Sequence, residues 1–305
     1  MATARHVILL TGATGFVGGA IGRAAVAHGH GVRALARSAT TAERLASDGL
    51  EPVFGDLTDV RSLRRAAEGA SVVIHAAFLR GSYRRLDEAI AVEQRATAAF
   101  VAACGDAGAR FVYTSGIGVL AATGTEPVTE ATTGSSPAMR WRRDLERLVL
   151  DAGGVVIRPA LVYGNGGGEI LRSLIAAAVT TGESLYPAPG DKPWPNVQVD
   201  DLAAAYLAAV AHPDSTVFNV AAGESTPRAV CEAIGRLIGA PDRTRGVTSD
   251  EAVERVPFAG WLAGPGVRVD SSRARATLGW VPTGPGLVAD IEFGSYAALV
   301  EAKRP

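Results

Sequence analysis

A chain of 305 residues is long enough to fold as one large domain or as two coupled lobes. Hydrophobic residues make up 48%, charged residues 20%, and the net charge is -1, a balance that excludes a strong field for nucleic acid or an anionic membrane. No apolar run approaches the ~18 residues of a membrane span. Cys104 and Cys231 stand alone, which indicates neither a disulfide framework nor a metal site and favours a reducing compartment, the cytoplasm.

The most informative stretch is a glycine-rich turn between a predicted strand, residues 7–10, and a predicted helix, residues 16–27. Gly12 permits a tight turn, Gly15 lets the backbone approach a diphosphate, and Gly18 lets the helix lie close to the strand. The N–H groups of the first helical turn then face the anion. Glycines also cluster in ordinary turns, but here the flanking elements match. The predicted cofactor-binding residues of this loop are Gly12, Thr14, Gly15, Phe16, Val17 and Gly18.

Short apolar runs alternate with helical patterns along the rest of the chain. Six more strands are predicted, at residues 32–36, 51–54, 71–75, 111–115, 155–158 and 217–220. Helices are predicted at residues 60–68, 86–107, 141–152 and 200–211. Strands that alternate with helices of this length indicate crossover units. The predicted fold class is therefore α/β, a Rossmann-type doubly wound parallel sheet.

The pattern changes after about Gly164. Residues 164–168 predict a flexible glycine loop, residues 187–195 hold four prolines, and residues 257–285 are rich in Gly, Pro and polar side chains. These segments predict a smaller C-terminal substrate lobe over the carboxyl edge of the sheet, where ligands of open parallel sheets bind. The predicted division is a dinucleotide-binding core at 1–164 and 197–222 and a substrate-binding lobe at 165–196 and 223–305.

The end of the second strand selects between the two dinucleotides. An acidic residue there would bind the adenosine ribose and repel a phosphorylated ribose. This chain has Arg37, whose guanidinium can clamp a phosphate with two parallel hydrogen bonds, so we predict NADP rather than NAD. The alternative is that Arg37 is an ordinary surface arginine. Asp56, after the third strand, is placed either to touch the adenine ring or to cap the helix that starts near Val60.

Seven motifs, spread almost end to end, match one family together. They are residues 11–18, 55–57, 73–77, 111–115, 158–164, 197–203 and 278–282. With them the chain resembles an extended short-chain dehydrogenase/reductase, of the kind grouped as NAD-dependent epimerase/dehydratases. The resemblance gives His75 a structural role in the segment that lines the nicotinamide pocket. It also implies that Leu57, Ala76, Ala77 and Thr114 bind the cofactor.

The resemblance also implies a catalytic Ser or Thr after the fifth strand and a Tyr-x-x-x-Lys pair on the next helix. In the family the lysine stands four residues before a glutamate, which Glu146 matches, so the lysine position is Arg142 and the tyrosine position is Ala138. The only lysines, Lys192 and Lys303, have no tyrosine four residues before them. The chain therefore resembles the atypical branch of the family, which keeps the cofactor fold but lacks the standard active-site set.

Three side chains are candidates for the chemistry instead. Ser115 lies beside the usual serine position, here Gly116, and is predicted to hold a substrate oxygen or, alternatively, to cap local backbone. Arg142 is predicted to hold the nicotinamide ribose; its alternative is an exposed helix arginine paired with Glu146. Tyr163 ends the sixth strand and is a candidate proton donor or, alternatively, a packing residue.

Two further groups bear on the substrate. Asp200 and Asp201 begin a helix, where carboxylates cap N–H groups, and we prefer that role over acid–base chemistry. An apolar pocket suited to a partly hydrophobic organic molecule could be lined by Phe78, Tyr83, Trp141 and Trp194.

We therefore expect an NADP(H)-dependent oxidoreductase that acts on a small, partly hydrophobic organic carbonyl or related substrate. The alternatives are a non-redox lyase, isomerase or cyclase on the same scaffold and a catalytically silent NADP-binding protein. We expect a small-molecule substrate and no nucleic-acid or membrane partner. Family members often dimerise through the two helices beside the fourth and fifth strands, so the resemblance implies a homodimer.

Overall fold

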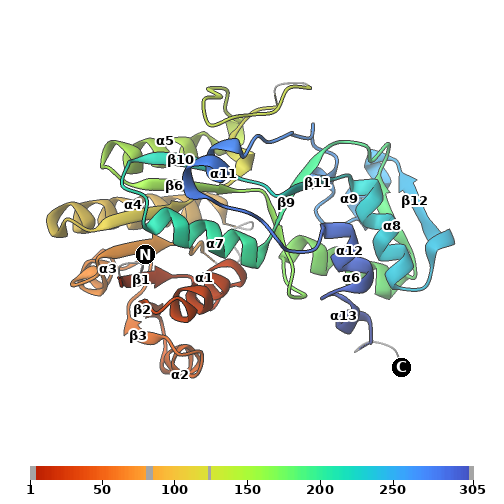
Figure 1. Cartoon of the computed structure of the whole chain (residues 1–305). Coiled ribbons are helices and arrows are strands. Elements are labelled where there is room, and N and C mark those ends of the chain that lie inside the picture. Colours follow the sequence, from red (N-terminus) through yellow and green to blue (C-terminus); the bar gives the residue numbers. More distant parts are fainter. Residues whose placement is uncertain (1–4, 80–84, 123–124, 302–305) are drawn as a thin grey trace.

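A seven-stranded sheet forms the centre of the larger part of the molecule, on the left in Figure 1. The computed structural model describes residues 5–79, 85–122 and 125–301. All strand pairs of this sheet are parallel, in the order β10-β6-β5-β4-β1-β2-β3. The strands are β1 (Val7–Thr11), β2 (Gly31–Ala36), β3 (Glu51–Phe54), β4 (Val72–His75), β5 (Arg110–Thr114), β6 (Val155–Pro159) and β10 (Thr216–Val220). The predicted doubly wound parallel sheet is confirmed, with every predicted strand present.

Helices cover both faces of the sheet. One face packs against α1 (Phe16–Ala27), α2 (Ala39–Ser47) and α7 (Val199–Val210), and the other against α3 (Val60–Ala67), α4 (Leu86–Ala107) and α5 (Arg140–Asp151). Successive residues of β1 enter opposite cores: Ile8 and Leu10 lie in one, Leu9 in the other. Side chains alternate along a strand, so a strand covered on both sides must be apolar throughout, and this is why the predicted runs are continuous.

A smaller lobe lies beyond the carboxyl edge of the sheet (Figure 1). Its helices are α6 (Glu169–Thr181), α8 (Pro227–Leu237), α9 (Ser249–Arg255), α10 (Ala259–Leu262), α12 (Leu287–Phe293) and α13 (Ala297–Glu301). A three-stranded sheet, β11-β9-β7, and a two-stranded sheet, β12-β8, complete it. These strands are β7 (Leu161–Tyr163), β8 (Ser184–Pro187), β9 (Trp194–Gln198), β11 (Gly223–Ser225) and β12 (Thr244–Val247). The lobe has an apolar cluster of its own, which includes Leu171, Ile175 and Ile234.

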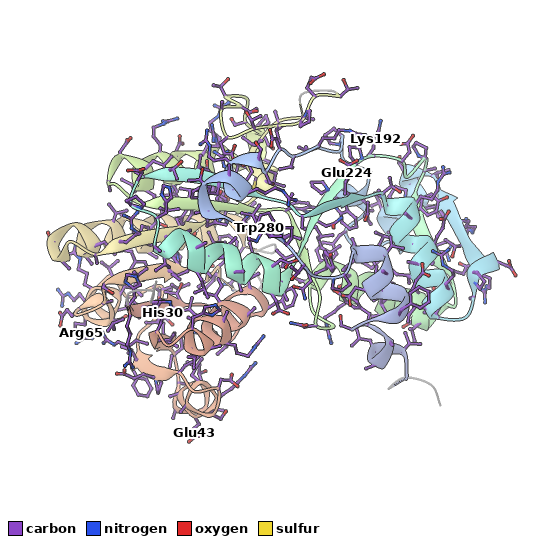
Figure 2. The ribbon with its side chains drawn as sticks, in the orientation of Figure 1. His30, Glu43, Arg65, Lys192, Glu224 and Trp280 are labelled. Atoms are coloured by element: carbon purple, nitrogen blue, oxygen red, sulfur yellow. The ribbon has the colours of Figure 1, made fainter. Side chains whose placement is uncertain are left out.

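One segment of the predicted lobe returns to the Rossmann core. Helix α11 (Ser272–Leu278) lies by α7 and β10, and Ala274 and Trp280 belong to the core cluster on that face. Trp280, labelled in Figure 2, donates its indole N–H to the carbonyl of Asp201 in α7 at 2.7 Å. The C-terminal part of the chain therefore links the lobe to the sheet.

The glycine loop at 164–168, predicted to be flexible, is held by the C-terminal segment. The Tyr296 hydroxyl accepts from Gly164 N at 2.9 Å and donates to Gly167 O at 2.7 Å. The Ser295 hydroxyl accepts from Gly166 N at 2.9 Å. The glycine-rich composition predicts a flexible backbone, but residues some 130 positions along the chain provide hydrogen-bond partners for its N–H groups.

Candidate functional site

The glycine turn has the backbone geometry that a diphosphate site needs. Gly12 has φ +76°, in the left-handed region, and a Cβ there would lie 2.6 Å from the carbonyl oxygen of Ala76. Gly15 N donates to Gly12 O at 2.8 Å and closes the turn. A Cβ on Gly18 would overlap the Gly12 carbonyl, so only glycine lets α1 approach β1 this closely.

Helix α1 presents an open N-terminus at this turn. Its N-cap is Gly15, which has no side chain to accept from the first N–H groups, and no other side chain caps them in the described part of the chain. Phe16 and Val17 form the first helical positions and Gly18 follows. Uncapped N–H groups together with the helix dipole favour an anion. The cradle therefore fits the diphosphate of a dinucleotide.

The adenosine end lies at the carboxyl ends of β2 and β3. These strands pair in parallel up to Ala36 and Phe54, so the following residues, Arg37 and Asp56, come to the same edge. Arg37 is exposed. Hydrogen bonds from Thr58 are the main reason that the pKa of Asp56 is lowered, and the Arg37 charge lowers it further.

Asp56 does not cap a helix, so that alternative is wrong. Its Oδ1 accepts from Thr58 N at 2.8 Å and from the Thr58 hydroxyl at 2.7 Å. The cap of α3 is Asp59, whose side chain accepts from Arg61 N and Ser62 N. Two acidic residues three positions apart precede this helix, and sequence alone did not show which one caps it.

Hydrogen bonds with Thr11, the last residue of β1, fix the end of β4. The Thr11 hydroxyl bonds His75 Nδ1 at 2.7 Å and accepts from Ala77 N at 3.2 Å. His75 is 1% exposed, and its Nε2 lies 3.5 Å from a carboxylate oxygen of Glu93 in α4. These contacts give His75 a place in the packing under the strand ends. Ala76 and Ala77 follow it beside the glycine turn.

Ser115 belongs to a buried ionic cluster. Its hydroxyl donates to Glu146 Oε1 at 2.6 Å rather than to backbone, so the capping alternative is wrong. Arg158 grips the same carboxylate with Nε to Oε1 at 2.8 Å and Nη2 to Oε2 at 2.7 Å, and Arg143 adds a contact at 2.9 Å. Glu146 is thus fully occupied, and the predicted alternative pairing of Arg142 with Glu146 is also wrong.

Arg142 lies against aromatic rings at the end of β5. Its Nη1 donates to the Thr114 carbonyl at 3.1 Å and to the Tyr113 hydroxyl at 3.3 Å. The guanidinium carbon lies 4.5 Å from the centre of the Trp141 ring and 5.1 Å from that of Phe78. The two rings stack, 6.0 Å apart and 16° from parallel. A cation and two aromatic faces therefore meet beside Thr114 and Ser115.

The Thr114 side chain is also engaged. Its hydroxyl accepts from the Tyr206 hydroxyl of α7 at 2.7 Å. Tyr206 is fully buried, and burial raises its pKa well above the ordinary value. This bond fixes the end of β5 from the opposite face of the sheet.

Tyr163 is turned into the lobe. It is 2% exposed, and its hydroxyl donates to the carbonyl of Pro285 at 2.6 Å. Burial, with smaller contributions from Asp290 and Asp201, raises its pKa to about 12. The geometry favours the packing alternative over a role for Tyr163 as proton donor.

The other predicted groups are dispersed. Trp194 packs with the lobe cluster rather than with Phe78 and Trp141, and Tyr83 lies outside the described residues. Gln198, not an aspartate, caps α7. Asp200 and Asp201 lie in the first turn of α7, as predicted. The predicted capping is wrong, because Asp200 accepts from Asn165 and the Asp201 carboxylate accepts from Thr283 N and Gly284 N.

Lys192 does not replace the missing lysine. It lies between β8 and β9 in the lobe, where Figure 2 labels it, and not on α5. One residue of the site, Glu93, was not predicted from the sequence. It contacts His75 and Tyr113 from α4. No local pattern marks it, because both contacts are long-range.

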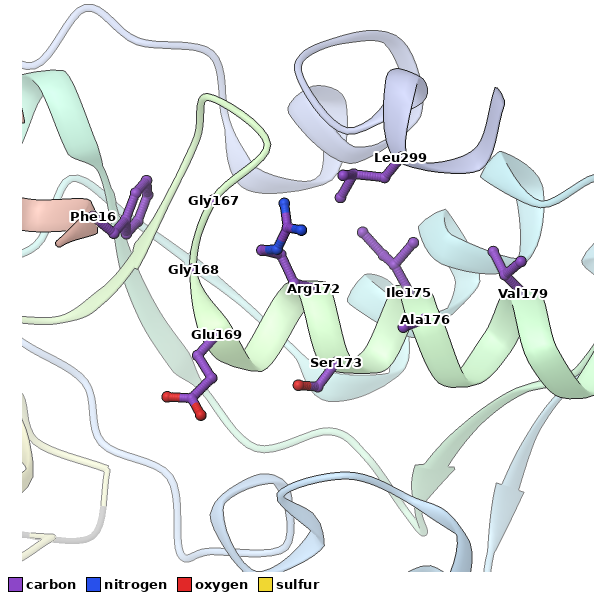
Figure 3. Close-up of a pocket in the computed structure, with 10 residues that line it drawn as sticks. All are labelled: Phe16, Gly167, Gly168, Glu169, Arg172, Ser173, Ile175, Ala176, Val179 and Leu299. Carbon is purple, nitrogen blue, oxygen red and sulfur yellow. The ribbon is translucent and has the colours of Figure 1, made fainter. Parts of the chain in front are cut away.

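A cavity of about 660 Å³ lies between α1 and the lobe (Figure 3). Phe16 bounds it on the core side, and α6 and α13 bound it on the lobe side. Its lining is mainly apolar, with Glu169, Arg172 and Ser173 as the polar members. Since Phe16 is the first residue of α1, the cavity adjoins the diphosphate cradle. Its size suits a small organic molecule.

None of the described helices is both long and apolar enough to cross a membrane. Within residues 5–79, 85–122 and 125–301 no group of three or more His, Cys, Asp or Glu side chains could hold a metal ion.

The sheet order, the glycine cradle and the open helix N-terminus define a dinucleotide-binding protein of the Rossmann type. The family model described as "NAD dependent epimerase/dehydratase family" matches residues 8–221, and the chain belongs to this family. The family and its relatives indicate an NAD(P)-dependent oxidoreductase or related enzyme.

Three known proteins show the range of the likeness. The chain is 28% identical over 295 residues to an uncharacterized protein of Schizosaccharomyces pombe, covering 95% of this chain and 99% of that protein. It is 30% identical over 302 residues to a 3-diazoavenalumate denitrifying reductase of a Streptomyces species, covering 91% and 96%. The solved structure of MoeE5 with UDP-glucose and NAD superposes with a TM-score of 0.77 at 21% identity, covering 98% and 100%. At that identity the structure shows the fold alone.

Proposed function

We propose that the chain is an NADP(H)-dependent reductase of a small, partly hydrophobic organic carbonyl or related substrate. The observation that carries the proposal is the meeting of Arg142 with Phe78 and Trp141 at the ends of β4 and β5. An arginine packed on two rings supplies fixed positive charge and apolar surface in one place. Such a site suits a substrate with an apolar body and a polar reacting group.

Arg37 supports the choice of NADP over NAD. Its guanidinium is exposed at the edge where the adenosine ribose would lie, and no acidic side chain follows β2 directly. A bidentate contact with a 2′-phosphate fits this position. Besides the glycine loop, the residues proposed to hold the cofactor are Arg37, Asp56, Leu57, Ala76, Ala77, Thr114, Ser115 and Arg142.

NADPH, when bound, supplies a hydride from its nicotinamide ring. Arg142 would hold the neighbouring ribose and place positive charge near the reacting carbon. Ser115 would contact the substrate oxygen. Its proton is donated to Glu146, so in the observed arrangement the hydroxyl can accept a hydrogen bond but has no second proton to give. The proton for the product would come from water.

One relative supports a reducible group other than a carbonyl. The Streptomyces protein is named as a denitrifying reductase of a diazo compound, so its substrate is not defined by a carbonyl. A reducible group other than a carbonyl is therefore part of the proposal. We also propose that the chain works in the cytoplasm, as a homodimer, on a small molecule.

The proposal is tested by the fall in NADPH absorbance with a panel of carbonyl and diazo compounds. Turnover that consumes one NADPH per product would support it. Tight cofactor binding without turnover of any compound would count against it.

A non-redox lyase, isomerase or cyclase is the second candidate. The hydroxyl protons of Ser115, Tyr113 and Tyr163 are each donated to an acceptor within the described part of the chain. None of them is then free to protonate a reduced product, and this favours a reaction without net reduction. Product formation without net NADPH oxidation would select it. The third candidate is a silent NADP-binding protein. An apolar cavity facing the nicotinamide would argue against it, and the cavity beside Phe16 is lined by none of the residues proposed to hold the nicotinamide.

A further inference from the structure

We propose that Glu93 and Tyr113 are positioning residues that fix the Arg142 guanidinium beside the nicotinamide ribose. The proposal rests on the proposed function, which makes Arg142 the ribose contact. Three residues on separate elements, α4, β5 and α5, would together hold one positive charge at the nicotinamide ribose.

The first step is the restraint on Arg142. Its side chain is 12% exposed, and Nη1 is held by the Thr114 carbonyl and the Tyr113 hydroxyl. The aromatic rings of Trp141 and Phe78 lie against the guanidinium. In the described part of the chain, Nε and Nη2 have no hydrogen-bond partner. One edge of the guanidinium is therefore anchored, and the other retains donors for a ligand.

The second step is the direction of the hydrogen bonds. The Tyr113 hydroxyl gives its proton to Glu93 Oε1 at 3.0 Å. Its oxygen lone pairs are then turned towards Arg142, which donates at 3.3 Å. A tyrosine whose proton is held by a carboxylate is a stronger acceptor for a guanidinium than a free one. Tyr113 thus connects the two charges without exchanging a proton.

Opposite charge also holds Arg142 near Glu93. Glu93 is 2% exposed, and Oε1 lies 4.0 Å from Arg142 Nη1. A buried carboxylate needs a nearby cation, and the Arg142 guanidinium supplies one. His75 Nε2, 3.5 Å from the other carboxylate oxygen, closes the group from below. Glu93 therefore both needs Arg142 and limits where its guanidinium can lie.

The experiment compares the affinities of the Tyr113→Phe variant for two ligands, NADPH and 2′,5′-ADP. NADPH reaches both halves of the site, whereas 2′,5′-ADP reaches only the adenosine half. We expect Tyr113→Phe to weaken NADPH binding about tenfold, the scale of one hydrogen bond to a charged group, and to leave 2′,5′-ADP within about twofold. Both dissociation constants are measured by calorimetry on the full chain. Glu93→Gln should behave in the same direction.

A double-mutant cycle separates positioning from loosening. If Tyr113 acts through Arg142, Tyr113→Phe should have no further effect in an Arg142→Met background. Tyr206→Phe is the matched control, since it removes another buried hydroxyl from the end of β5 and leaves the Glu93–Tyr113–Arg142 contacts in place.

Three outcomes would contradict the positioning role, and a fourth would contradict the proposed function. Equal weakening of both ligands by Tyr113→Phe, additive effects in the cycle, or an equal loss in Tyr206→Phe would overturn the positioning role while the proposed function stands. If the unmodified chain bound neither ligand, the proposed function itself would fail, and this inference with it.

Discussion

At the scale of single residues, Arg37 makes the cofactor choice testable. Replacing it by Gln removes the charge-assisted clamp from the adenosine side and leaves the glycine cradle unchanged. We expect Arg37→Gln to weaken NADPH binding by about 10- to 100-fold, the worth of a hydrogen-bonded charge, and to leave NADH within about twofold. Calorimetry with both nucleotides measures the difference. Equal losses for NADPH and NADH would show that Arg37 does not read the 2′-phosphate.

The buried carboxylate of Glu93 predicts how stability responds to acid. Burial by itself raises the pKa of Glu93, but His75, Arg142 and Tyr113 outweigh burial and hold the pKa below its usual value. A carboxyl with a lowered folded pKa stabilises the fold above its unfolded pKa of about 4.3, and this contribution is lost as the pH falls through the folded pKa.

We therefore expect the free energy of unfolding to fall less steeply below pH ~4.3 in Glu93→Gln than in the unmodified chain. Urea unfolding at pH 7, 4 and 3 gives the slopes. Glu88→Gln, an exposed site on the same helix, is the control and should keep the original slope. Parallel curves for the unmodified chain and Glu93→Gln would contradict the prediction.

At the scale of elements, the contact between β1 and α1 depends on Gly18. A Cβ there would overlap backbone atoms of Gly12, which cannot turn aside as a side chain can. We expect Gly18→Ala to push α1 away from the cradle, to destabilise the chain by roughly 1–3 kcal/mol, and to abolish NADPH binding. Thermal unfolding and calorimetry measure the two effects.

Gly105 in α4 supplies the matched control, because nothing lies within 4 Å of a Cβ added there. Gly105→Ala should raise stability by about 0.4–1 kcal/mol through the entropy of the unfolded chain. If Gly18→Ala were as mild as Gly105→Ala, close packing at the turn would not be what requires glycine.

The elements and the cradle were predictable from sequence, whereas most site contacts were not. Strand β1 shows why: its continuous apolar run and the glycines after it are both local signals. The Glu146–Arg158 pair is not local, since the carboxylate sits on a helix that otherwise looks like an exposed, charged face. Tyr113 looks like a packing residue until α4 brings Glu93 to its hydroxyl. Tertiary contacts decide these roles.

At the scale of the whole molecule, the last part of the chain connects the lobe to the sheet. Asp201 of α7 holds Thr283 N and Gly284 N, and the next residues carry Pro285, whose carbonyl accepts from Tyr163. Tyr296 then fixes the glycine loop that leads into α6. The cavity between Phe16 and α6 therefore has walls from both parts of the molecule, and its shape depends on these tethers.

Tyr296→Phe removes only the hydroxyl oxygen and tests whether the wall of the cavity depends on this tether. The ring stays in the buried cluster, but Gly164 N and Gly167 O lose their partner, and an unsatisfied buried group costs about 1–3 kcal/mol. We expect a lower thermal midpoint and faster hydrogen exchange at residues 164–168, while exchange in β1 and β4 stays unchanged. Tyr186→Phe is the control, because the Tyr186 hydroxyl has no hydrogen-bond partner in the described part of the chain and its ring packs on Arg228. If exchange rose equally in the sheet, or not at all in the loop, the C-terminal segment would not be what holds the wall of the cavity.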